Sequence, residues 1–111
     1  MFKVPNSDFT EEQRIDLYSN ALLPDLIKSI CIHIFKGHLT NTFFNFSDFF
    51  LKQRMDDDDV KKSLKNKIIL LLQEKNYKLA YAFNKTGLII TKTQEEMDKS
   101  VWKSNLDFNQ I

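Results

Sequence analysis

Cysteine, glycine, proline and arginine are scarce in this chain of 111 residues, which contains one Cys, two Gly, two Pro and two Arg. A single cysteine cannot form an internal disulfide, so we expect a reducing, intracellular setting. Two glycines that lie 50 residues apart cannot provide the closely spaced glycines of a phosphate-binding loop. The chain also lacks a long apolar run and, at its start, the basic and apolar regions of a signal peptide. We therefore expect neither a membrane span nor a secretory signal.

The remaining composition is that of one globular domain. Hydrophobic residues make up 42% of the chain and charged residues 28%, which argues against a disordered protein. The length suits a single domain over residues 1–111, with residues 1–9 as an N-terminal arm and residues 104–111 as a C-terminal tail. Lys, Asn, Phe, Ile and Tyr are abundant, a bias that indicates an A+T-rich gene, as in many bacteriophages and large DNA viruses.

Capping signals predict helices near both ends of the chain. Residues 10–13 form a capping box, which predicts a helix start. Pro24 removes a backbone donor and clashes with the preceding turn, so we expect a break there and a second helix that ends at Gly37. A second capping box at residues 93–96 predicts a C-terminal helix that reaches Trp102.

The middle of the chain predicts a small sheet. Residues 39–46 are rich in Thr and Phe and predict a strand, followed by a short helix capped by Ser47 or Asp48. Residues 60–76 have apolar side chains at helical spacing, with Asn76 as a left-handed stop.

A hairpin follows that helix. Residues 77–83 alternate in polarity, residues 84–87 predict a tight loop in which Gly87 supplies a positive φ, and residues 88–92 form the return strand. The predicted fold is therefore α+β and helix-rich, with a small antiparallel sheet of about three strands and the winged-helix-like order α-α-β-α-α-β-β-α.

No residue pattern in the chain predicts an enzyme, a metal site or a cofactor. The aspartate run 56–59 lacks the alternate ligands and glycine of a calcium loop, so we interpret it as a helix start. Cys31 and His33 lie on different helical faces and His38 lies beyond the helix end, which argues against a zinc site or a nucleophile–base pair. We interpret Cys31 as a small core residue.

Charge is unevenly distributed along the chain. Residues 1–59 hold 6 basic and 10 acidic side chains, whereas residues 60–92 hold 8 basic and one acidic. This block could be a solvated surface, a phosphate-binding surface or the positive half of a protein contact. The basic residues that would form such a patch are Lys61, Lys62, Lys65, Lys67, Lys75, Lys78, Lys85 and Lys92.

Aromatic and apolar residues suggest a protein-contact surface. Ten Phe are many for a thin domain, and the hairpin has apolar side chains on both faces, with Tyr81, Phe83, Leu88 and Ile90 on one. Either a partner or the terminal helices would cover the second face. The contact candidates are Phe43, Phe44, Phe46, Phe49, Phe50, Tyr81, Phe83 and Ile89.

The winged-helix-like order raises a nucleic-acid alternative, in which residues 60–76 would enter a DNA groove and residues 84–87 would form the wing. The four aspartates at the start of that helix would repel phosphates, and neither the helix nor the wing contains an arginine to read guanine. A sequence-specific DNA reader is therefore disfavoured, whereas a small nucleic-acid-associated protein that uses the lysine block stays open.

In the stretch of residues 60–92, the segment Leu-Leu-Gln-Glu-Lys-Asn-Tyr-Lys-Leu over residues 71–79, followed by a loop with Gly87 and by residues 88–90, resembles the helix–hairpin ending of small α+β proteins encoded by tailed bacteriophages and large DNA viruses. Those proteins usually have Gly where this chain has Asn76, and a Trp closing the last strand. The resemblance covers about a third of the chain and implies a non-enzymatic, virion-associated structural or accessory protein, in the virion or the host cytoplasm. It would bind other proteins, in a larger assembly or as a homo-oligomer.

Overall fold

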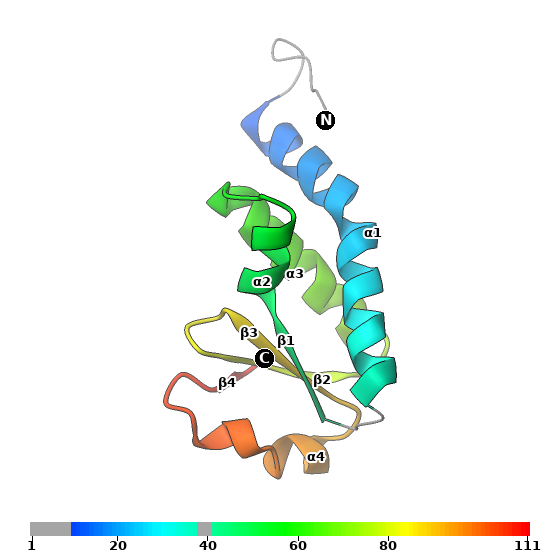
Figure 1. The fold of residues 1–111 in the computed structure, drawn as a ribbon, viewed down its shortest axis with the longest axis vertical. Coiled ribbons are helices and arrows are strands. Elements are labelled where there is room, and N and C mark those ends of the chain that lie inside the picture. The colour runs from blue at the N-terminus through cyan, green and yellow to red at the C-terminus, as the bar shows by residue number, and fades with distance from the viewer. Residues whose placement is uncertain (1–9, 38–40) are drawn as a thin grey trace.

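The computed structural model describes residues 10–37 and 41–111, which form an α+β fold (Figure 1). The α+β class is confirmed, and so is the predicted order of elements from the first strand to the last α-helix. In chain order the elements are α1 (Glu11–Gly37), β1 (Asn41–Asn45), α2 (Phe46–Lys52), α3 (Asp58–Glu74), β2 (Lys78–Ala82), β3 (Gly87–Thr91), α4 (Gln94–Asp98), the 3₁₀ helix η1 (Val101–Ser104) and β4 (Asn109–Gln110).

The strands form one antiparallel sheet in the order β1-β3-β2-β4. The sheet has four strands, one more than predicted, because residues predicted to form a tail instead pair with β2. The amide of Ile111 extends this edge by donating to the carbonyl of Leu79 at 2.9 Å. A strand of two residues is too short to show an alternating pattern, so the sequence gives no signal for it.

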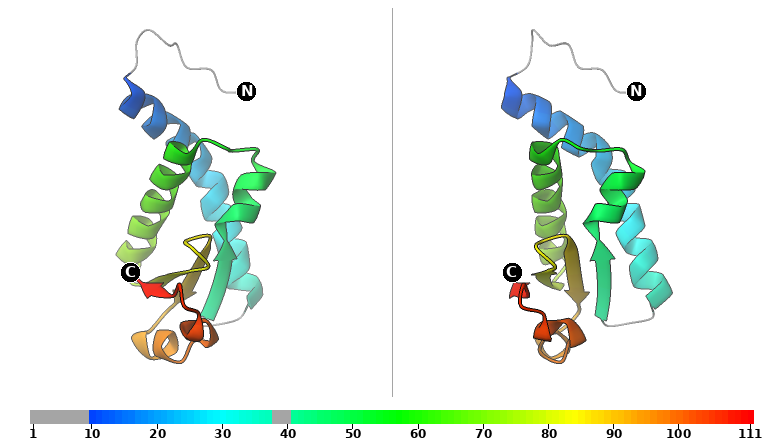
Figure 2. Two further views of the ribbon diagram at one scale, coloured as in Figure 1. Left: turned by 90° about the vertical axis from the view of Figure 1, so that its left-hand side faces the viewer. Right: turned by 60° about the vertical axis from the view of Figure 1, so that its left-hand side comes forward.

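A different part of the chain covers each face of the sheet. Helices α1, α2 and α3 pack on one face, while α4 and η1 lie on the other side of the sheet (Figures 1 and 2). On the first face, Leu79, Leu88 and Ile90 join the main core. On the second face, Met97 packs with Ala80, Ala82 and Ile89. The chain's own helices thus cover both faces, which was one of the two alternatives left open by the sequence.

Helix α1 is continuous through Pro24, which corrects the prediction of two helices broken at that residue. The predicted capping box is present at its start: Thr10 Oγ1 accepts from the Gln13 amide at 3.1 Å, and Gln13 Oε1 accepts from the Thr10 amide at 3.0 Å. Pro24 is exposed, so its ring does not interrupt the packing of Leu26 and Ile30 in the core. Burial of the apolar face offsets the local cost of the proline.

The other helices end and begin at polar caps. Helix α2 is capped by Asn45, whose side chain accepts from the Asp48 amide, and not by Ser47 or Asp48 as predicted. Asn76 has the predicted left-handed conformation after α3, with a φ of 69°. Thr93 caps α4, but that helix ends at Asp98, before the predicted end at Trp102.

The hairpin loop differs from its prediction in the residues that take left-handed backbone. Phe83, Asn84 and Lys85 have φ values of 53°, 55° and 65°, whereas Gly87 has no positive φ. Gly87 is instead required by a close approach, because a Cβ atom there would lie 2.4 Å from Cε2 of Phe43 on the neighbouring strand. The glycine thus makes room for an aromatic ring.

Replacing Gly87 with Ala should lower the free energy of unfolding by about 1–2 kcal/mol, because the added methyl group must displace the packed ring of Phe43. Urea unfolding of the wild type and of Gly87→Ala measures this loss. In a Phe43→Leu background the same change should cost less. An equal cost in both backgrounds would show that the ring is not what restricts position 87.

Replacing Pro24 with Ala should raise the free energy of unfolding by about 1–3 kcal/mol, because the substitution restores a helical backbone donor and removes the ring's clash with the preceding turn. Thermal unfolding followed by circular dichroism measures the gain. A loss of stability would mean that packing of α1 depends on the local geometry that proline imposes.

Candidate functional site: an aromatic face and a lysine-lined groove

The Phe-rich segment contributes mainly to the core. Most of the predicted contact residues are buried: Phe44, Phe46, Phe49, Phe50 and Ile89 are all 5% exposed or less. They cannot form an accessible surface in this fold, which corrects the expectation that the whole segment faces a partner. The remaining three candidates, Phe43, Tyr81 and Phe83, are at least partly accessible.

Three aromatic rings pack together on the side of the sheet that α4 and η1 cover. Phe43 lies edge-to-face against Phe83, with ring centroids 5.6 Å apart, and stacks on Trp102 at 5.4 Å. Phe83 is 43% exposed, and the other two side chains are partly buried. We call these three residues the aromatic face.

The position of Phe83 follows from the loop backbone. Strand alternation predicts that Phe83 shares a face with Tyr81, but β2 ends at Ala82 and the left-handed turn carries the ring to the opposite side, against Phe43. Trp102 was not among the predicted contact residues. Its signal in the sequence is weak, because a lone Trp near the end of a predicted helix is usually a core residue.

The lysine block does not form one patch. Lys75, Lys78 and Lys92 are exposed at or beside the start of β2 and the end of β3, whereas Lys85 lies in the hairpin loop at the other end of these strands. Lys65, on α3, reaches this loop and donates to the carbonyl of Lys85 at 2.9 Å. These five lysines are thus separated into two groups at opposite ends of the hairpin, while Lys61, Lys62 and Lys67 lie along α3.

Two ion pairs join α1 to α3 or to its cap, and one of them links the acidic residues 1–59 to the basic block of residues 60–92. Lys67 Nζ lies 2.5 Å from the Asp16 carboxylate, which links α3 to α1. Arg14 Nη1 lies 3.3 Å from Asp57 at the start of α3. Part of the charge separation seen in the sequence therefore stabilises the packing of two helices and is not available to a partner.

A groove of about 440 Å³ runs between α2, the turn after it, the first turns of α3 and the hairpin loop. Its apolar lining includes Phe46 and Phe50 from the core and the exposed Leu51. Its complete lining is Phe46, Ser47, Phe50, Leu51, Met55, Asp56, Asp58, Lys61, Lys65 and Thr86. We call this the lysine-lined groove.

Lys61 and Lys65 line the groove and Lys85 lies in the adjoining hairpin loop, and each is placed over an aromatic ring. The ammonium groups of Lys61, Lys65 and Lys85 lie 5.8, 5.4 and 6.0 Å from the ring centroids of Phe50, Phe46 and Tyr81 respectively. Burial, followed by repulsion from the other two lysines, lowers the pKa of Lys65. The charges of Lys61 and Lys85 thus add to the effect of burial in disfavouring the charged form of Lys65.

The aspartate run is a helix start, as predicted. Asp57 Oδ1 accepts from the amides of Asp59 and Val60 at 3.0 and 3.2 Å. The hydrogen bond from the Val60 amide is the main cause that lowers the pKa of Asp57. The nearby Arg14 and the bond from the Asp59 amide lower it further. Among the described residues no three His, Cys, Asp or Glu side chains are grouped to hold a metal ion.

Cysteine and histidine, the other metal-binding residue types of the chain, are found at positions 31, 33 and 38. Cys31 is exposed on α1, which corrects its interpretation as a core residue. His38 and the side chain of His33 lie outside the described residues.

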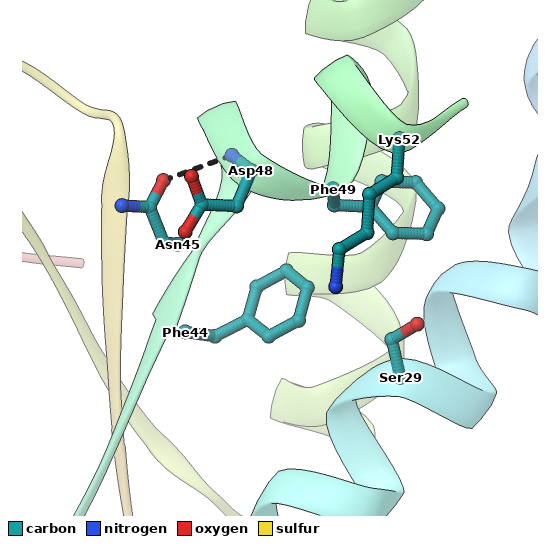
Figure 3. A pocket seen from close by; sticks show the side chains of 6 residues that line it. All are labelled: Ser29, Phe44, Asn45, Asp48, Phe49 and Lys52. Atoms are coloured by element: carbon teal, nitrogen blue, oxygen red, sulfur yellow. Dashed lines mark hydrogen bonds between the residues drawn. The ribbon is translucent and has the colours of Figure 1, made fainter. Parts of the chain in front are cut away.

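A smaller pocket of about 130 Å³ lies between α1, β1 and α2 (Figure 3). Lys52 extends from α2 toward Ser29 on α1, and the tip of its side chain lies beside the ring of Phe44 (Figure 3). Its other polar groups have a structural use, because the Asn45 side chain accepts from the Asp48 amide at 3.2 Å. The pocket has room for a few water molecules, since one water occupies about 30 Å³.

Comparison with known proteins found no matching family model, no similar curated protein and no similar solved structure. None of the helices in the described part of the chain is both long and apolar enough to cross a bilayer.

Stability should fall in acid because of Asp57. The pKa of Asp57 is lower in the folded than in the unfolded state, so its ionised form adds to the free energy of unfolding. This contribution is fully present above the unfolded-state pKa of about 3.9 and disappears as the pH falls through the folded-state pKa. Replacing Asp57 with Asn should keep the cap and weaken this acid dependence, whereas Ala should also cost about 1 kcal/mol at neutral pH. Urea unfolding at several pH values between neutrality and strong acid measures both effects. An Asn variant with the wild-type acid dependence would contradict this assignment.

Proposed function

We propose that this protein is a non-enzymatic protein-interaction module that associates with other protein chains, in the first instance with copies of itself, through the aromatic face. The resemblance of residues 60–92 to phage and large-virus proteins supports a virion or assembly component as its setting.

The observation that carries the proposal is the conformation of Phe83. A bulky side chain in left-handed backbone costs about 1 kcal/mol or more, and such strain is concentrated at functional sites. Here it is combined with 43% exposure of an aromatic ring at the tip of a hairpin. Asn or Gly would relieve the strain, so what Phe contributes here is its ring, one part of which packs on Phe43 while 43% of the side chain stays open to a partner.

Two further features support association between copies. The formal net charge is +1, so copies of the chain repel one another weakly at neutral pH. Beside Trp102, Val101 is 76% exposed, and Leu106 in the following turn is fully exposed. Aromatic side chains are enriched at the centre of protein contacts, and the exposed aliphatic side chains beside them add apolar area that a partner could cover.

Replacing Phe83 with Asn should abolish this association and leave the fold intact, because Asn tolerates left-handed backbone. Light scattering at increasing protein concentration, in low and high salt, measures the solution mass. The wild type should grow in mass in both salts, since apolar contacts are not screened, and the variant should stay a monomer.

Leu70→Asn is the matched control, because Leu70 is 61% exposed on α3 and is not part of the aromatic face. It should associate like the wild type. Wild-type protein that stays monomeric at every concentration would rule out self-association. Equal masses for Phe83→Asn and the wild type would show that the aromatic face is not the contact.

A further inference from the structure

We propose that the lysine-lined groove binds an extended acidic segment of a partner protein that also carries an apolar side chain. The groove shares no residue with the aromatic face, so this proposal can be tested independently of the proposed function.

The side chains of α3 give the two ends of the groove opposite charges. Asp58, Lys61 and Lys65 all line it, and their spacing of three and four residues places them on one side of the helix. Asp58 lies 3.7 Å from Lys61, so its charge is already partly compensated. Lys65 lies one turn further along, next to the hairpin loop, where it bonds to the carbonyl of Lys85. The groove is thus acidic at the start of α3 and basic toward the hairpin.

The basic end favours a bound anion. Lys61 and Lys65 line the groove and Lys85 lies in the adjoining hairpin loop, and repulsion from Lys61 and Lys85 contributes to the lowered pKa of Lys65. A carboxylate placed among them would relieve that repulsion and form charge-assisted hydrogen bonds. Because Asp56 and Asp58 line the other end, only a ligand of limited negative charge fits, with its acidic group toward the hairpin.

The lining favours a peptide over nucleic acid. Leu51, which is 77% exposed, and the partly exposed Met55 form an apolar wall above the buried Phe46 and Phe50. A continuous phosphate backbone would place charge against this wall and against the two aspartates, whereas an extended peptide can place an apolar side chain there and a carboxylate by Lys65.

The test titrates the full chain into a short fluorescein-labelled peptide in which glutamates flank a leucine–phenylalanine pair, and follows anisotropy. Lys61→Gln and Leu51→Ser should each weaken binding by about fivefold to tenfold, through lost charge and lost apolar contact respectively. A short labelled DNA duplex is titrated in parallel, at low and high salt.

The chain provides matched controls for both variants. Lys62→Gln makes the same charge change at the next position of α3, where the side chain is exposed and does not line the groove. Leu70→Ser removes an exposed leucine elsewhere on that helix. Both should bind the peptide like the wild type, and circular dichroism shows that all four variants are folded.

Three results would overturn the proposal. Equal loss from Lys61→Gln and Lys62→Gln would mean a diffuse charge effect. An unchanged affinity for Leu51→Ser would mean that the apolar wall is not used. Tighter binding of the duplex than of the peptide, with a steep fall in salt, would assign the lysines to nucleic acid.

Discussion

The fold depends on the need to cover a small sheet on both faces. All five residues of β3 are buried, and this strand pairs with β1 on one side and with β2 on the other. Its side chains alternate between two apolar clusters, one under α1, α2 and α3 and one under α4 and η1. The short C-terminal segment is therefore part of the structural core, although its elements are too small to be stable alone. Both candidate surfaces lie where this covering ends, at the tip of the hairpin.

The sequence is sufficient to predict features that depend on local chemistry. The capping box at Thr10, the aspartate cap of α3 and the left-handed Asn76 are each determined by side chains within a few residues of the backbone groups that they contact. The α+β class follows in the same way, because helical and alternating periodicities are local patterns.

Features that depend on tertiary contacts were not predictable in this way. Pro24 remains in a helix because distant residues pack along the rest of α1, and Gly87 is needed because of the ring of Phe43 on another strand. The aromatic face was predicted only in part, since the turn that places Phe83 beside Phe43 reverses the alternation of β2. The lysine-lined groove joins residues of α2, α3 and the hairpin, and their proximity has no counterpart in their spacing along the chain.

The pairing of β1 with β3 has a consequence for how the chain acquires this structure. Asn45 pairs with Gly87 and Asn41 with Thr91, and β1 lies at the edge of the sheet, so in the described part of the chain β3 is its one strand partner. Closing the intervening segment costs conformational entropy before the pairing can contribute. A growing chain on the ribosome therefore exposes the apolar side chains of β1 until the hairpin has emerged. Synthesis of the second half of the molecule sets the time during which the first half is open to aggregation.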